Sequence, residues 1–541
     1  MKHYNFILLL LSFSFLLSSC ARKGRPQGGP KDEDAPILVS AKPAYESLNF
    51  KDDNIRIYFD EYIVLKDLNK QLIVSPPFKN DPLITPQGTP SKYINIKILD
   101  SLRENTTYTF NFGNAVQDNN ENNPLENFKY IFSTGDFIDS LSIAGSIKDI
   151  TIKEPKKNYS VLLYKIDSTY TDSIVYKNKP DYVTRTYDSI NYKFTNIAEG
   201  KYFLMAVDEE SPDYKFNPRT DKIGFFKDTL YLPKDSIKKK PMILFKEIQP
   251  YIFKRGKEVT KGKIQFGFTG KQENIEIKLT SKVPSDFVYR TSFEKDKDTI
   301  NYWYYSKEKL DSLNFIISEK TSIDTATVSL RKKKMDSLSV SSNVKSVLHL
   351  NDTLILSTNN PIINVDKTKF SLENLTDSTD VDYELKTISN TELAVLFEKK
   401  MKRSYRLTAL PKAIEDIFKV GSKDTLDYKF NTKDTEDYGS IILSVDKQVK
   451  APVIIELLKD NKVFKKKILN SSGKIEFNLL VPDTYMIRAI IDENGNGIWD
   501  TGKYQEKRQP ESIIYYPDEL PELRANWISN LNFTVTKKGT E

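Results

Sequence analysis

Two separate stretches of the chain carry the same series of short motifs in the same order, and this repetition restricts the fold more than any other feature. The paired motifs are Ile55–Ile57 with Leu354–Leu356, Tyr108 with Tyr405, Tyr130–Asp136 with Tyr428–Asp434, Ala144–Ile147 with Tyr438–Ile441, and Phe194–Tyr202 with Phe477–Tyr485. Both series then run through an alanine, Ala206 or Ala489, into an acidic turn. Self-similarity within a chain is the signature of duplicated structural units. The sequence therefore predicts a two-domain module that occurs twice.

The segments within each module have the side-chain pattern of short β-strands. Apolar and polar residues alternate in Asn54–Asp60, and Tyr93–Ile98 and Tyr108–Phe112 alternate in the same way. A period of two is typical of strands that bury one face, and short strands separated by Asn-, Gly- and Pro-rich turns favour β-sandwiches. Tyr108, which follows Leu102, is predicted to form a tyrosine corner, in which the hydroxyl group bonds to upstream backbone.

A further β-domain is predicted between the two modules. Residues 240–335 contain strand-like runs such as Lys263–Phe268 and Ile275–Leu279. A chain of 541 residues is in any case too long for one hydrophobic core.

The N-terminal segment has the pattern of a secretory signal. Lys2 precedes the apolar run Phe6–Leu17, whose rise as a helix is about 18 Å, too short to span a hydrocarbon core of about 30 Å. Leu17-Ser18-Ser19 then leads to Cys20, and this ending resembles a bacterial lipoprotein signal in which the cysteine carries the lipid. The alternative is a cleaved signal without lipid, in which Cys20 is incidental.

Residues 20–36 are predicted to form a flexible tether, because Gly, Pro and charged residues replace any apolar periodicity there. The acidic stretch within Lys31–Asp34 resembles the surface-export signal of Bacteroidetes lipoproteins, but basic residues lie nearer to Cys20. The sequence thus leaves both a periplasmic and a cell-surface orientation open.

Composition argues against catalysis and against nucleic acid as a partner. The net charge of +7 is spread over a 62.4 kDa chain, and Cys20 is the single cysteine, so no internal disulfide forms. The histidines are His3, in the signal, and His349, which leaves few groups suited to general base or nucleophilic chemistry. The carboxylate pair Asp60 and Glu61 is adjacent in a strand and points to opposite faces. We predict that the chain is not an enzyme.

At these motifs the chain resembles known domain families. Phe59-Asp60-Glu61 and the closing Phe132-Ser133-Thr134-Gly135 resemble the bacterial Ig-like domain of S-layer proteins, while the units that follow each copy resemble the transthyretin-like, carboxypeptidase-regulatory-like sandwich. The combination is similar to Ig-like lipoproteins of Bacteroidetes, and neither domain type is itself a catalyst. The expected divisions are signal 1–19, tether 20–36, Ig-like domain 37–137, transthyretin-like sandwich 138–236, β-domain 237–335, second Ig-like domain 336–435 and second transthyretin-like sandwich 436–541.

One loop resembles a calcium-binding loop. Asp492, Asn494, Asn496 and Asp500 place oxygen side chains at alternating positions, with Gly497 between them, as in loops that coordinate Ca²⁺. Lys503 stands where a bidentate carboxylate is expected. The other interpretation is an Asn/Gly-rich turn held by its own hydrogen bonds, with no cofactor.

Aromatic residues supply a second hypothesis, glycan binding. Trp303, Tyr305, Trp499 and Trp527 have rings that could stack on sugars, although half of such residues in a strand are normally core. The basic runs at 238–240, 331–334 and 465–467 are interpreted as solvated loop charge or, alternatively, as contacts with lipopolysaccharide phosphates.

Taken together, these patterns predict an all-β, rod-like row of separately cored sandwiches anchored to the outer membrane by an N-terminal lipid. The expected function is a structural or adhesive scaffold with a protein partner, and the alternative is a glycan-binding surface lipoprotein.

Overall fold

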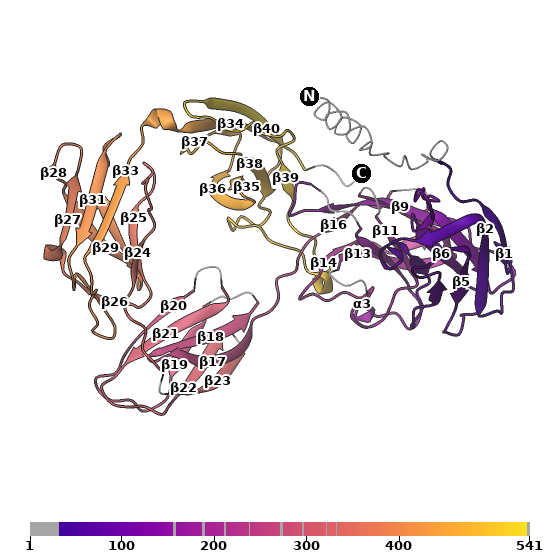
Figure 1. The fold of residues 1–541 in the computed structure, drawn as a ribbon, viewed down its shortest axis with the longest axis horizontal. Helices are drawn as coiled ribbons and strands as arrows, with labels where there is room; N and C mark the ends of the chain where they lie inside the picture. Colours follow the sequence, from indigo (N-terminus) through magenta and orange to yellow (C-terminus); the bar gives the residue numbers. More distant parts are fainter. Residues whose placement is uncertain are drawn as a thin grey trace, which may run out of the picture.

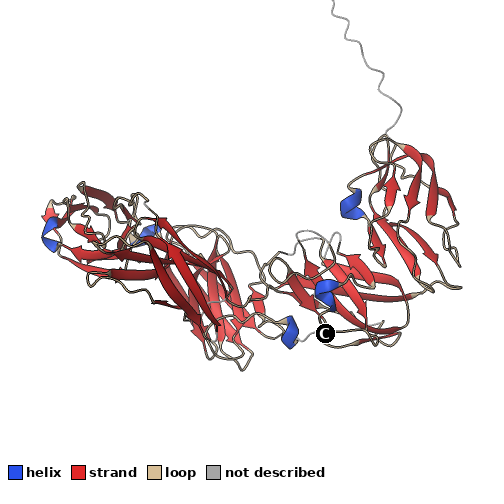
Figure 2. Ribbon diagram, turned by 90° about the horizontal axis from the view of Figure 1, so that it is seen from below, coloured by secondary structure: helices blue, strands red, loops and turns tan. Residues whose placement is uncertain are grey.

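The computed structural model describes residues 32–154, 158–186, 190–209, 213–236, 239–270, 274–294, 297–320, 322–331 and 333–537. Cys20, the signal and most of the tether lie outside these residues. The fold is all-β, as predicted, with helices of only one turn (Figure 2). Among the described residues, no helix is long and apolar enough to cross a membrane.

The strands form five consecutive units, which we call sandwiches 1 to 5 (Figure 1). Each has a hydrophobic core of its own. Sandwich 1 contains β1 (Leu38–Lys42), β2 (Asn54–Leu65), α2 (Leu68–Gln71), β3 (Ile73–Ser75), β4 (Leu83–Thr85), β5 (Ser91–Lys97), β6 (Thr107–Gly113), β7 (Val116–Asp118) and β8 (Phe128–Ser133). Sandwich 4 contains β24 (Val340–Ser342), β25 (Leu354–Thr358), β26 (Ile362–Val365), η1 (Lys367–Lys369), β27 (Phe370–Asn374), β28 (Thr379–Asp380), β29 (Tyr383–Ser389), β30 (Glu392–Phe397), β31 (Ser404–Ala409), β32 (Ile414–Asp416) and β33 (Leu426–Asn431).

Sandwiches 1 and 4 share their strand order. The first sheet runs β1-β2-β5-β4 in one and β24-β25-β30-β29 in the other, and the second sheet contains β3-β6-β8 or β27-β31-β33. The predicted tyrosine corner is confirmed, because the Tyr108 hydroxyl oxygen accepts a hydrogen bond from the backbone N–H of Arg103 at 2.8 Å. In sandwich 4 the Tyr405 hydroxyl accepts from the N–H of Lys400 at 2.9 Å.

Sandwiches 2 and 5 also share their strand order. Sandwich 2 contains β9 (Leu141–Asp149), β10 (Ser160–Lys165), α3 (Ile174–Lys177), β11 (Tyr182–Arg185), β12 (Asn191–Ile197), β13 (Gly200–Asp208), β14 (Lys222–Phe225), β15 (Leu230–Leu232) and β16 (Met242–Leu244). Sandwich 5 contains η2 (Thr435–Asp437), β34 (Gly439–Lys447), β35 (Val453–Lys459), β36 (Lys462–Leu469), β37 (Gly473–Leu480), β38 (Met486–Ile491), η3 (Tyr504–Glu506), β39 (Ile513–Tyr515) and β40 (Ile528–Val535).

One sheet runs β12-β9-β16 in sandwich 2 and β37-β34-β40 in sandwich 5, each with a parallel pair, β9 with β16 and β34 with β40. The other runs β11-β10-β13-β14 and β36-β35-β38-β39. A tyrosine hydroxyl closes a turn in both, from Tyr202 to the Ala198 carbonyl at 3.0 Å and from Tyr485 to the Val481 carbonyl at 2.7 Å. Sandwiches 2 and 5 thus share their strand order, as sandwiches 1 and 4 do.

Sandwich 3 lies between the two modules and has its own topology. Its strands are β17 (Ile252–Thr260), β18 (Lys263–Thr269), β19 (Glu276–Leu279), β20 (Val288–Phe293), β21 (Thr299–Tyr305), β22 (Ser312–Glu319) and β23 (Ser322–Ser329). They form the sheets β17-β18-β21-β20 and β19-β22-β23.

The prediction of a rod-like row is wrong, because sandwich 5 returns to pack on sandwich 2 (Figure 1). One core contains residues of both: Leu162, Phe203, Met205 and Phe225 from sandwich 2, and Ile454, Ile490, Tyr504 and Ile513 from sandwich 5. We call this core the shared core. The central strands β10, β13 and β35 are therefore buried on both faces.

Candidate functional site

The shared core is completed by residues 501–509 of sandwich 5, which we call the docking segment. Its central residue, Tyr504 in η3, is fully buried. The Tyr504 hydroxyl donates to the Asp172 carbonyl at 3.1 Å, and its backbone N–H donates to the Glu247 carboxylate at 2.5 Å. Asp172 lies in sandwich 2 and Glu247 in the segment that follows its strand β16, so these two hydrogen bonds of Tyr504 fix the position of sandwich 5.

Aromatic rings of sandwich 2 surround Tyr504. The ring centres of Tyr176, Phe203 and Phe225 lie 6.1, 5.6 and 5.5 Å from its own. The Lys507 ammonium lies 4.0 Å from the centre of the Tyr504 ring and 2.7 Å from the Asp172 carboxylate. A cation held between an aromatic face and a carboxylate stabilises the docked position.

Shape and backbone contacts make the docking specific. The Thr501 hydroxyl donates to the Lys246 carbonyl at 2.7 Å, and the Gln509 amide donates to the Phe225 carbonyl at 3.0 Å. A Cβ atom on Gly502 would lie 2.5 Å from the Phe245 ring, so only glycine fits at that position. Burial raises the pKa of the Glu247 carboxyl, the acceptor for the Tyr504 N–H.

The predicted calcium loop lies directly before the docking segment and is closed by its own hydrogen bonds. The Asn494 and Asn496 side-chain amides both donate to one Asp500 carboxylate oxygen at 2.6 Å. The buried Asp492 carboxylate accepts from the backbone N–H groups of Asn496 and Gly497 at 3.1 and 2.8 Å.

Glu511, which the sequence analysis missed, holds the two ends of the same loop. Its carboxylate accepts from the N–H groups of Glu493 and Asp500 at 2.8 and 3.0 Å. Burial, followed by the nearby Asp500 and Asp492 carboxylates, raises the Glu511 pKa. Within the described residues, no group of three or more His, Cys, Asp or Glu side chains is arranged to hold a metal. Calcium binding therefore stays a prediction.

The four aromatic residues named as glycan contacts are not brought together. Trp303 and Tyr305, on β21, pack with Ile417 and Phe418 between sandwiches 3 and 4, and Trp303 is buried. Trp499 packs against the shared core and donates its indole N–H to the Glu511 carbonyl at 3.0 Å. Trp527 is 49% exposed, with Arg524 over its ring at 5.0 Å. Glycan binding stays a prediction, and the four residues do not form a common aromatic surface.

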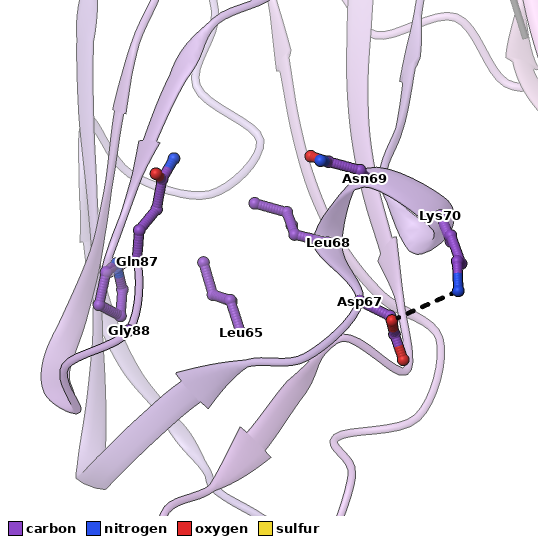
Figure 3. Close-up of a pocket in the computed structure, with 8 residues that line it drawn as sticks. Leu65, Asp67, Leu68, Asn69, Lys70, Gln87 and Gly88 are labelled. Atoms are coloured by element: carbon purple, nitrogen blue, oxygen red, sulfur yellow. Dashed lines mark ion pairs between the residues drawn. The ribbon is translucent and has the colours of Figure 1, made fainter. Parts of the chain in front are cut away.

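Neither His349 nor the surface cleft of sandwich 1 combines groups suited to catalysis. His349 lies where sandwich 4 meets sandwich 5, with Nδ1 3.2 Å from the Tyr438 hydroxyl oxygen. A cleft of about 390 Å³ lies in sandwich 1 beside α2 (Figure 3). It is lined by Leu65, Asp67, Leu68, Asn69, Lys70, Pro86, Gln87 and Gly88, and its single carboxylate, on Asp67, pairs with Lys70 at 3.7 Å. This lining offers no nucleophile with an adjacent base.

Comparison with known proteins agrees with this architecture. Residues 32–134 match the family model described as a bacterial Ig-like domain. This match covers sandwich 1. No curated protein matches the chain.

Three solved structures are among those with some similarity to the chain. Domains 5-6 of the S-layer protein SbsC are 11% identical over 35% of this chain and 99% of that one, with a TM-score of 0.18. A multidomain segment of titin is 10% identical over 45% and 94%, with a TM-score of 0.14. The tandem Ig repeats of Dlar are 14% identical over 34% and 97%, with a TM-score of 0.14.

The docking segment generates the first prediction. Replacing Tyr504 by Ala removes a fully buried aromatic side chain and its three ring contacts, which is expected to cost about 3–5 kcal/mol of docking free energy. We expect sandwich 5 to separate from sandwich 2, seen as a larger radius of gyration in small-angle X-ray scattering. Tyr231→Ala, at a residue that is 48% exposed, is the matched control and should leave the radius unchanged. An unchanged radius in Tyr504→Ala would contradict the prediction.

Glu209, which follows β13, leads to a second prediction, on the pH dependence of stability. Burial raises its pKa to about 7, although the N–H groups of Tyr214 and Asp213 donate to Oε2 and favour the charged form. Because the folded chain holds this proton more tightly than the unfolded chain, the free energy of unfolding should fall as the pH rises through the range from the ordinary value of 4.5 to about 7.

Glu209→Gln cannot ionise, so it should flatten this dependence and stabilise the chain by up to about 3 kcal/mol above pH ~7. Urea unfolding at several pH values measures the effect. The exposed Glu199→Gln is the control, and a parallel response of both variants would disprove the assignment.

Proposed function

We propose that the chain is a non-catalytic scaffold of the bacterial cell envelope. In this proposal Cys20 carries a lipid that anchors the chain in the outer membrane of a Bacteroidetes-type envelope, facing the periplasm or the cell surface. The sandwiches act together as one body that presents Ig-like surfaces to protein partners. No cofactor is required for this role.

The observation that carries the proposal is the shared core. Flexible arrays of domains hold their neighbours through small interfaces, whereas here a buried tyrosine, aromatic rings and β-sheet faces join two units that are far apart in sequence. Such a contact fixes the distance and angle between the two modules. Fixed geometry is what a scaffold needs and what a string of independent binding domains does not.

A candidate partner surface lies on sandwich 1, on the open face of the sheet that contains β2 and β5. Tyr62 is 56% exposed and Tyr93 is 40% exposed. Lys92 lies 5.5 Å from the Tyr62 ring centre, and Arg56 lies 5.8 Å from that of Tyr93. Tyrosine and arginine are enriched in protein interfaces because they supply large contact areas with polar ends. We call this group the tyrosine face.

The lipid anchor gives a direct test of location. Metabolic labelling with palmitate should mark the wild-type chain, and Cys20→Ser should abolish both the label and recovery of the chain with membranes. Ser19→Ala keeps a small residue before the cysteine and should retain both. A label that survives in Cys20→Ser would exclude this anchor.

The tyrosine face gives the test of the partner. A photo-reactive amino acid placed at Tyr93 should yield a crosslinked protein adduct in intact cells, and Tyr62→Ala should reduce the yield several-fold. The same reagent at the exposed Tyr231 of sandwich 2 is the matched control. Equal yields from Tyr93 and Tyr231 would show that the tyrosine face has no specific partner.

A further inference from the structure

The edge strand β36 exposes large apolar side chains beside a row of lysines. Val463, Phe464 and Ile468 are each 48% exposed. The strand also carries Lys462, Lys465, Lys466 and Lys467, and it has no acidic residue. Monomeric proteins seldom combine exposed apolar side chains and unbalanced charge on one short element unless that element has a partner.

The duplicated module provides an internal comparison for β36. Its counterpart in sandwich 2 is β11, the edge strand of the equivalent sheet. Sandwich 1 covers β11: the N–H of Val183 donates to the Ser75 hydroxyl at 3.2 Å, and the Arg185 guanidinium donates to the Lys70 carbonyl at 2.8 Å. In sandwich 5 no described strand pairs with the outer edge of β36. The same position is therefore protein-covered in one copy and open in the other.

Charge identifies what the open strand can accept. Within the described part of the chain, none of the four lysines of β36 forms an ion pair, although lysines nearby do, as Lys459 with Asp483 at 2.6 Å. Lys465 and Lys466 donate only to backbone carbonyls, of Asn478 and Gly497. A ligand that is itself anionic would supply the missing counter-charge.

The strand is poorly suited to pairing with a second copy of itself. Leu457 pairs with Lys465 and Leu458 with Val463, so the register shifts there and Phe464 is the unpaired residue of a β-bulge in β36. Bulges and lysines are the devices by which edge strands avoid pairing with other strands. Two copies of β36 would also bring like charges together.

The apolar side chains continue onto the adjacent loop. A Cβ atom on Gly497 would lie 3.4 Å from the Ile468 side chain, and the next residue, Ile498, is also 48% exposed. Apolar residues that stand among lysines are typical of elements that lie at the level of lipid headgroups, where the apolar groups enter the acyl boundary and the ammonium groups meet phosphates.

We propose that β36, together with Ile498, docks on an anionic lipid surface. Val463, Phe464 and Ile468 enter the headgroup region, and the β36 lysines contact lipid phosphates. The inference rests on the proposed location at the cell envelope, but its test does not involve Cys20. A failure of the anchor and a failure of this surface are therefore distinguishable.

Vesicle flotation with residues 21–541, which start after Cys20 and include every described residue, tests the proposal. The chain should float with vesicles of phosphatidylcholine and phosphatidylglycerol at low salt, and much less with phosphatidylcholine alone or at high salt. Lys462→Glu combined with Lys467→Glu changes two exposed lysines whose ammonium groups have no hydrogen bond to a described residue, and it should weaken partition about 30-fold or more.

The matched control is Lys254→Glu combined with Lys257→Glu on β17, which changes the net charge equally at two exposed lysines and should keep the binding. Val463→Ser combined with Ile468→Ser should weaken binding at both salt concentrations. Circular dichroism establishes that each variant is folded. Absence of flotation with anionic vesicles, or an equal loss in the β17 control, would overturn the proposal. Binding to polyglutamate without flotation would overturn it in favour of an acidic protein partner.

Discussion

Burial of two β-sheet faces against each other is the interaction on which the rest of this structure depends. Sandwiches 2 and 5 each fold around a core of their own, and the shared core then joins them through Tyr504 and the apolar faces of β10, β13, β35 and β38. Sandwiches 3 and 4 therefore connect, in sequence, two units that pack directly against each other. Removing water from apolar surface is what holds this body together, at about 25 cal/mol per Å² buried.

The sequence predicts which segments form β-strands better than it predicts which domains pack against each other. Alternation in Asn54–Asp60 indicates burial of one sheet face. The tyrosine corners at Tyr108 and Tyr405 involve hydrogen bonds between residues close in sequence. Both features can therefore be predicted from short segments. The continuous apolar runs in β10 and β35 indicate strands that are buried on both faces. A pattern of alternating apolar and polar residues does not identify such strands. Tyr504 carries no such signal, because polar residues surround it in sequence and its contacts come from Asp172 and Phe225.

In the candidate sites, too, some features can be predicted from the sequence and others depend on how the domains pack. The loop that contains Asp492 and Asp500 is recognisable from its spacing, but Glu511, which holds its ends, is separated from it in sequence and is identified by the fold. Trp303 is as conspicuous in the sequence as Trp527, yet one is buried between sandwiches and the other is exposed. Residue type alone cannot distinguish the two, since burial depends on which domain packs on that strand.

The long separation between the two halves of the shared core has a consequence for biogenesis. Sandwich 2 leaves the ribosome well before sandwich 5 is synthesised, and contacts between distant segments form slowly because their loop must close first. Until then the apolar side chains of β10 and β13 that belong to the shared core are exposed to solvent. Exposed apolar surface favours aggregation with other incompletely folded chains. A chaperone that shields this surface during synthesis would protect the nascent chain until sandwich 5 is made.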